Sequence, residues 1–276
     1  MEFLKKKPLF EQALDKSLTH FGEDNRLKEA VSYALKSGGK RFRPLLVLAV
    51  GEAVGECGVM EAALAVEYFH TASLIADDLP CMDNDAMRRG RPSLHVEFGE
   101  DVALLASYAL ITAAFEMIYR AGKGKDDTVV ATALKEAASL AGIQGATGGQ
   151  FYDLYPPELD CGGIARVHYL KTGTLFELSF LFGWLFGGGE RERLDEVKVC
   201  ARHFGSAFQI CDDLRDLGED GAMNICDILG EKRARALFHS EMEAFEKRLR
   251  ALGLATPAMK GLLQALAQRL PLGAGS

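Results

Sequence analysis

The chain has 276 residues, of which 48% are hydrophobic and 26% charged, a composition typical of a globular protein with a sizeable core. Its formal net charge of −7 argues against nucleic acid as a partner, because a phosphate backbone requires a broad cationic surface. The six cysteines form no Cys-x-x-Cys pair, which disfavours zinc and disulfides and predicts reduced thiols in a cytoplasmic protein. The basic N-terminus lacks a following apolar segment, so we expect no signal peptide.

Apolar residues recur at intervals of three and four along most of the chain, as in helices that bury one face. The clearest predicted helices cover residues 62–76, 104–119, 129–141 and 193–216. The most apolar stretch, 175–189, contains Glu177 and three glycines and is too short to span a bilayer, so we expect a buried helix and no stable membrane insertion. Without any recognisable interdomain linker, we predict one all-α domain over residues 1–276, with roughly ten helices.

A glycine turn with three cations is the first candidate site element, since residues 38–43 read Gly-Gly-Lys-Arg-Phe-Arg. Pro44 suits the first position of a helix, where free backbone amides favour anions. Basic turns are also common on surfaces, so this turn alone does not establish an anion site. The same applies to His70, since a single histidine on an apolar helix is more often a hydrogen-bonded core residue than a ligand.

The first acidic cluster contains Asp77, Asp78 and Asp83 and follows a predicted helix. Pro80 cannot continue that helix, so we expect it to end near Asp78. The resulting turn can bring Asp77 and Asp83 to one point. The basic residues that follow, at 88, 89 and 91, are consistent either with charge balance or with binding of an anion.

The second acidic cluster contains Asp212, Asp213 and Asp216, with Asp212 and Asp216 on one helix face. Two bare carboxylates about 4 Å apart repel by about 4 kcal/mol at an effective dielectric near 20, so such clusters call for a cation. Oxygen ligands without neighbouring His or Cys favour Mg²⁺, which shares its coordination with substrate phosphates. One acidic run alone would most often be a solvated helix end, but both clusters here follow apolar residues.

In this order, the elements resemble the trans-isoprenyl diphosphate synthases, the short-chain polyprenyl synthase family. The resemblance covers about residues 30 to 220, and its motifs are Gly39-Lys40-x-x-Arg43-Pro44, His70, Asp77-Asp78-x-x-x-x-Asp83, Arg88-Arg89-Gly90, Gly148-Gly149-Gln150-x-x-Asp153, Lys171-Thr172-Gly173 and Gln209-x-x-Asp212-Asp213-x-x-Asp216. It implies an all-α helical bundle of the isoprenoid synthase type around a central active-site cavity, and a homodimer.

The resemblance also implies a role for each matching residue. The expected metal ligands, for several Mg²⁺ ions bound with the diphosphate, are Asp77, Asp83 and Asp212, supported by Asp78, Asp213 and Asp216. The allylic diphosphate would be held by Arg88, Lys171, Thr172 and Gln209, and isopentenyl diphosphate by Lys40, Arg43, His70 and Arg89. The implied catalytic residues are Asp77, Asp83, Arg88, Lys171 and Asp212.

The implied activity is a prenyl transfer. Pyrophosphate leaves the allylic substrate, the double bond of isopentenyl diphosphate attacks the resulting cation, and loss of a proton completes a chain five carbons longer. Cationic groups stabilise the leaving charge, and an apolar cavity protects the cation from water.

Product length is expected to depend on Phe69, Ala72 and Ser73, one to two helical turns before Asp77. Members resembling bacterial farnesyl synthases often carry an aromatic residue five positions before the first aspartate, where this chain has Ala72. We therefore expect a C15–C20 product and favour geranylgeranyl diphosphate.

One departure from the family keeps two alternatives open. Members usually carry lysines after the second cluster that cover the allylic diphosphate, but this chain has no lysine between Lys198 and Lys232. Lys232 or Arg233 could reach back, a partner could supply the charge, or affinity could be lower by about 1.5–3 kcal/mol. A non-catalytic or regulatory subunit of a heteromeric synthase, or a class I terpene cyclase, are the alternative functions.

Overall fold

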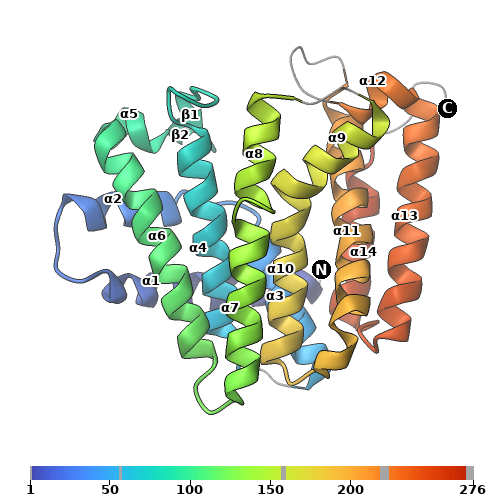
Figure 1. Cartoon of the computed structure of the whole chain (residues 1–276), viewed down its shortest axis with the longest axis horizontal. Coiled ribbons are helices and arrows are strands. Elements are labelled where there is room, and N and C mark those ends of the chain that lie inside the picture. The colour runs from blue at the N-terminus through green and yellow to red at the C-terminus, as the bar shows by residue number, and fades with distance from the viewer. Residues whose placement is uncertain (1, 56–57, 157–159, 218–223, 272–276) are drawn as a thin grey trace.

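The computed structural model describes residues 2–55, 58–156, 160–217 and 224–271 (Figure 1). Its α-helices are α1 (Lys7–Ser17), α2 (Arg26–Leu35), α3 (Phe42–Val54), α4 (Met60–Asp77), α5 (Leu94–Phe98), α6 (Glu100–Ala121), α7 (Asp127–Ala141), α8 (Ala146–Leu154), α9 (Cys161–His168), α10 (Thr174–Phe186), α11 (Leu194–Arg215), α12 (Ile225–Leu229), α13 (Glu231–Ala251) and α14 (Pro257–Arg269). Short 3₁₀ helices cover Glu2–Lys6, Leu18–Phe21 and Arg191–Arg193, and a π-helical turn, η3, covers Tyr169–Gly173.

The structure confirms the predicted all-α fold. The described residues contain 14 α-helices and one two-stranded ribbon, in which β1 (Met87–Arg88) pairs antiparallel with β2 (Arg91–Pro92). The prediction of roughly ten helices was too low because several short helices escape periodicity analysis. Examples are α5 and α12, each of 5 residues and each followed by a glycine with positive φ.

The core is organised around α10, which is buried at every residue, as predicted for the most apolar stretch. The helices α3, α4, α7 and α11 all pack against it (Figure 1). Aromatic rings join α10, α11 and α13, since the ring centroid of Phe204 in α11 lies 5.0 Å from that of Phe176 in α10 and 5.3 Å from that of Phe245 in α13. Edge-on aromatic contacts of this kind add to the stability provided by burial.

The end of α4 places the first acidic cluster at the top of the bundle. The helix ends at Asp77, as expected from Pro80. The chain then turns back, and the backbone N–H of Asp83 donates to the carbonyl of Asp77 at 2.9 Å. The two aspartates predicted to meet are therefore joined by a hydrogen bond between their backbones.

The basic turn before α3 has a backbone that requires glycine. Gly38 and Gly39 have φ of 81° and 119°, and a Cβ on Gly39 would lie 2.6 Å from the guanidinium of Arg89. The sequence predicted Pro44 at the first position of a helix. It occupies the third position of α3, because the helix begins at Phe42. A proline is still tolerated there, since the N–H groups of the first turn have no helical partners.

Candidate active site

A cavity of about 790 Å³ opens beside the first acidic cluster. It lies among α4, α6, α7, α8 and η3, and Asp77, Cys81, Met82 and Lys171 line it together. The rest of its lining is mainly apolar and includes Phe69, Ala72, Ser73, Ile111, Phe115, Ala137, Ala141, Leu154 and Leu175. This is an apolar cavity that carries charged groups at one part of its wall.

All three residues expected to control product length line this cavity. Phe69 lies eight residues before Asp77, about 12 Å along the helix axis at 1.5 Å per residue. Its ring meets that of Phe115 of α6 edge to face, with centroids 5.4 Å apart. Ala72 is buried between this pair and the acidic cluster, and its small side chain leaves the space open.

Asp77 and Lys171 bring opposite charges to the cavity. Burial raises the pKa of Asp77 to about 7, Lys171 opposes this rise, and the neighbouring Asp83 carboxylate adds to it. Gln150 donates to Asp83 at 3.4 Å, and Lys171 is ion-paired with Asp153. Burial and the Asp83 charge therefore disfavour the ionised form of Asp77, and a cation bound nearby would favour it.

Lys171 and Thr172 lie in the π-helical turn η3, a type of local widening that is frequent at functional sites. The turn packs directly on α8. A Cβ on Gly149 of α8 would lie 2.2 Å from the backbone N of Lys171, so only glycine permits this approach. Gln150 and Asp153 follow Gly149 on the same helix, which explains how α8 reaches both Asp83 and Lys171.

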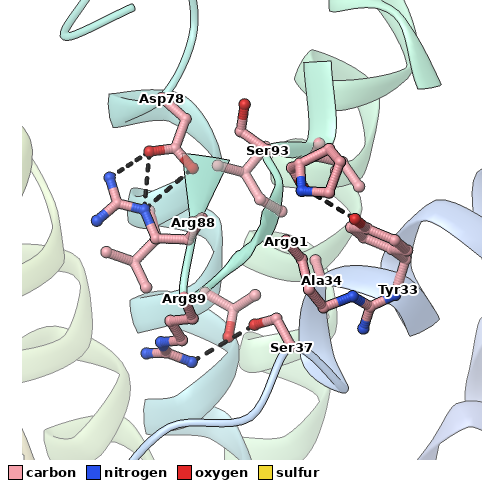
Figure 2. Close-up of a pocket in the computed structure, with 13 residues that line it drawn as sticks. Tyr33, Ala34, Ser37, Asp78, Arg88, Arg89, Arg91 and Ser93 are labelled. Atoms are coloured by element: carbon pink, nitrogen blue, oxygen red, sulfur yellow. Dashed lines mark hydrogen bonds and ion pairs between the residues drawn. The ribbon is translucent and has the colours of Figure 1, made fainter. Parts of the chain in front are cut away.

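Asp78 lies on a different side of α4 from Asp77. It is buried, and it accepts from the Arg88 guanidinium through Nε at 2.9 Å (Figure 2). Arg88 also bonds Asp85 at 3.0 Å. Neither Asp78 nor Arg88 lines the large cavity; both line a small one beside β1 and β2. The structure thus separates Asp78 from Asp77 and places it as the partner of Arg88.

The residues expected to hold isopentenyl diphosphate form a second group of cations. Arg43 stacks on Phe176 at 4.3 Å, and its Nη1 lies 3.4 Å from Nε2 of His70. Burial lowers the pKa of His70 well below its usual range, and Arg43 and Arg89 add to the effect. Arg89 donates to the carbonyl of Gly38, two residues before Lys40, and to the Ser37 hydroxyl at 3.5 Å (Figure 2). The structure therefore brings Arg43, His70 and Arg89 into one region, whereas the charges that act on Lys40 are those around Asp212.

The second acidic cluster is divided between two environments. Asp212 pairs with Arg269 of α14 at 2.7 Å, and burial raises the pKa of Asp212 against the lowering by Arg269 and Arg215. Asp213 is buried and accepts from the backbone N–H of Ile225 at 2.9 Å, which anchors the chain that returns to the bundle. Asp216 is exposed one residue beyond α11, and its N–H donates to the Asp212 carbonyl at 3.0 Å.

Gln209 faces away from the large cavity in this structure. It donates to Asp213 at 3.0 Å and lines another cavity of about 470 Å³, together with His168, Tyr169, Arg202 and His203. Its expected contact with the allylic diphosphate would therefore require a change of side-chain conformation.

Sequence reasoning assigned no role to Gln150, Asp153 or Arg269. The Gly-Gly-Gln-x-x-Asp motif contains Gln150 and Asp153, but it does not predict their contacts with Asp83 and Lys171. Arg269 had no signal, because 57 residues separate it from Asp212 in the chain.

The described residues contain no group of three or more His, Cys, Asp or Glu side chains arranged to hold a metal by themselves. The donor set nevertheless fits a hard divalent cation that shares its coordination with a phosphate. Asp77 and Asp83 offer oxygen ligands alone, and burial together with the Asp83 charge raises the pKa of Asp77, which a bound cation would lower.

Comparison with known proteins agrees with this geometry. Residues 24–234 match the family described as polyprenyl synthetase. The structure resembles an FPP/GFPP synthase from Zymomonas mobilis, with a TM-score of 0.85 and 32% identity over 95% of this chain and 99% of that one. It also resembles a geranyltranstransferase from Thermotoga maritima, with a TM-score of 0.84 and 34% identity over 98% and 99% of the two chains.

A curated relative, the heterodimeric geranylgeranyl pyrophosphate synthase large subunit 1 of Arabidopsis thaliana, is 42% identical over 223 residues. The match covers 77% of this chain but 59% of the relative's length. The match to the family extends over most of the chain, including both acidic clusters and the three basic motifs. The chain belongs to the polyprenyl synthetase family.

Proposed function

We propose that the protein is a short-chain prenyltransferase that condenses isopentenyl diphosphate with an allylic diphosphate. One observation carries this proposal: an apolar cavity of about 790 Å³ is lined at one place by Asp77 and Lys171. An allylic substrate has the same division, with an apolar tail and a diphosphate head. The cavity suits the tail, and its charged part suits the head.

The expected diphosphate groups follow from the placement of charge. Lys171 lies beside Asp77 at the cavity and suits the allylic diphosphate. Lys40, Arg43, His70 and Arg89 suit isopentenyl diphosphate, because they are basic groups outside the large cavity, and the charge of Asp212 acts on both Lys40 and Arg43. Arg43 in particular has an Nε that is buried without a hydrogen-bond partner among the described residues.

We further propose Mg²⁺ as the metal, held by Asp77 and Asp83 on one side and by Asp212 on the other. When bound, magnesium supplies positive charge that stabilises the leaving pyrophosphate. Asp78 and Asp213 would act indirectly. Asp78 holds Arg88, and Asp213 anchors Ile225.

In the proposed reaction the allylic C–O bond breaks and its electron pair leaves with pyrophosphate. The π electrons of isopentenyl diphosphate form the new C–C bond at its terminal alkene carbon and leave a tertiary cation on the other alkene carbon. The methylene next to this cation, on the diphosphate side, then loses a proton, and the electrons of that C–H bond form the new double bond. Lys171 stabilises the negative charge of the leaving group. The apolar lining, including Ala72, Phe69 and Phe115, excludes water from the allylic cation.

We favour a C20 product over C15. The proposal rests on two features of the cavity wall. The small side chain of Ala72 leaves space for the tail, and the Phe69–Phe115 ring pair lies farther from Asp77 than Ala72 does. The aromatic pair would stop the growing tail once it has passed Ala72 and Ser73. A cytoplasmic location stays a prediction, consistent with the five described cysteines, all of which are free thiols.

We also propose a homodimer formed through α6. By length and composition alone, this helix could cross a membrane. Only 39% of its most apolar stretch is buried inside the protein, so most of that stretch is left for a partner to cover. Its exposed face presents Leu104, Leu105, Tyr108 and Ile111. A contiguous apolar face of this kind marks an association surface.

Incubation of the purified protein with Mg²⁺, isopentenyl diphosphate and each of the C5, C10 and C15 allylic primers tests the proposal, with chromatography of the products. We expect elongation by the protein alone. Cyclised hydrocarbon without isopentenyl diphosphate would instead indicate a terpene cyclase. Turnover that begins only when a second type of subunit is added would indicate a non-catalytic subunit, an alternative suggested by the relative named as part of a heterodimer.

A further inference from the structure

The chain lacks a lysine where members of the family carry cations that cover a diphosphate. No lysine occurs between Lys198 and Lys232, and residues 218–223 lie outside the described part of the structure. Lys232 and Arg233, which the sequence suggested as substitutes, are exposed on α13. A different cation, from the last turn of α14, lies at the second acidic cluster.

That cation is Arg269, and its environment is unusual for an arginine. Its side chain is 18% exposed, and its Nη2 bonds the Asp212 carboxylate at 2.7 Å. Its Nε and Nη1 are buried without a hydrogen-bond partner among the described residues. The guanidinium lies 4.8 Å from the ring centroid of Phe208 and 5.8 Å from that of Phe42.

Two unsatisfied donors on a buried cation are costly in a folded protein. A guanidinium carries five N–H donors, and buried donors almost always have partners. The aromatic rings hold the guanidinium plane in place but accept hydrogen bonds only weakly. An anion with several oxygens would satisfy the donors that Asp212 leaves unused.

The charges around Arg269 also favour an anion. Asp212 is approached by Arg215, with Nη1 at 3.8 Å, as well as by Arg269. Lys40 lies close enough that Arg269 and Arg215 both lower its pKa, in addition to a larger lowering by burial. The carboxylates of Asp212 and Asp216 thus lie among three cations, which leaves a net positive charge around Arg269.

We propose that Arg269 binds a substrate diphosphate and replaces, from the C-terminal helix, the cation missing after Asp216. Arginine suits this role because its planar donors bind phosphate in a bidentate manner. Without substrate, Arg269 neutralises Asp212. This inference rests on the proposed function and adds to it a binding residue far from both acidic motifs in sequence.

Calorimetry on the full chain tests the inference without turnover. One titration uses isopentenyl diphosphate without metal, and another uses the unreactive geranyl S-thiolodiphosphate with Mg²⁺. We expect Arg269→Gln to weaken binding at least tenfold in one titration, which identifies the diphosphate that Arg269 holds. Arg269→Lys should recover part of the lost affinity, because lysine keeps the positive charge but not the planar pair of donors.

Arg250→Gln is the matched control, since Arg250 is exposed on α13 and pairs with Glu246. It should bind both ligands as the wild type does. Thermal unfolding of each variant distinguishes a loss of binding from a loss of structure. If Arg269→Gln fails to fold, Arg269→Leu replaces it, because leucine keeps an apolar contact with Phe208.

Unchanged binding of both ligands by Arg269→Gln would overturn the inference, even if its melting temperature fell, because the role would then be structural. Failure of the wild-type protein to bind either diphosphate would contradict the proposed function as well. The two failures are therefore distinguishable.

Discussion

Neighbouring aspartates at the end of α4 have opposite environments. Asp77 lines the large cavity, whereas Asp78 is buried against Arg88. Successive residues of a helix point about 100° apart, so two adjacent carboxylates need not share a function. The sequence identifies the cluster but not this division, because it depends on where Arg88 lies after the turn.

Asp78→Ala should destabilise the protein without changing the lining of the large cavity. Arg88 would lose its buried partner, and we expect the free energy of unfolding in urea to fall by about 1–3 kcal/mol. Asp85→Ala is the control, because Asp85 is exposed and also bonds Arg88. Equal stability of Asp78→Ala and the wild type would refute the structural role of this ion pair.

His70 should make stability depend on pH. Burial disfavours its protonation most, and Arg43, Arg89, Arg41 and Arg88 add to this effect, so its folded pKa lies well below 6.5. Below pH 6.5 the unfolded chain binds a proton that the folded protein does not, and stability therefore falls as pH falls. His70→Gln should be more stable relative to the wild type at pH 5 than at pH 8, as measured by urea unfolding; a pH-independent difference would contradict the assignment.

At the scale of elements, the cavity depends on contacts that periodicity does not reveal. Helix boundaries near Pro80 and the burial of α10 could be predicted, because both follow from local sequence. The π-helical turn that carries Lys171, and its contact with Gly149, could not. Those features arise from the packing of α8 against η3, which follows later in the chain.

The Phe69–Phe115 pair should set the far limit of the product. Phe115→Ala would remove one of the two rings and lengthen the product, whereas Ala72→Tyr would fill the cavity nearer Asp77 and shorten it. Chromatography of products made with geranyl diphosphate measures both shifts. Tyr119→Ala, one turn beyond Phe115 and exposed, is the control. An unchanged chain-length profile in both cavity variants would contradict this account of product length.

At the scale of the whole molecule, α6 connects the cavity with the surface. Its inner residues, including Ala106, Leu110 and Ala114, are buried, while Ile111 contributes to the cavity wall. The apolar periodicity predicted the helix but not which face remains exposed, since that depends on which helices cover it. The extent of the domain also stays a prediction.

Tyr108→Glu should convert the proposed homodimer into a monomer. A charge in the middle of a buried apolar interface costs several kcal/mol, enough to dissociate a dimer at micromolar concentration. Light scattering coupled to size-exclusion chromatography measures the mass, with the exposed Lys135→Glu on α7 as the control. A wild-type protein that is monomeric at all concentrations would contradict the proposed interface.

The rate at which labelled isopentenyl diphosphate enters extractable prenyl product, compared between the wild type and Asp77→Ala, tests the central claim most directly. Among the proposed metal ligands, Asp77 is the side chain that also lines the large cavity. We predict incorporation by the wild-type protein alone and a loss of about 10²–10³-fold in Asp77→Ala, as for removal of a group that stabilises transition-state charge. Asp101→Ala, in the first turn of α6, should match the wild type. Full activity of Asp77→Ala would contradict the account.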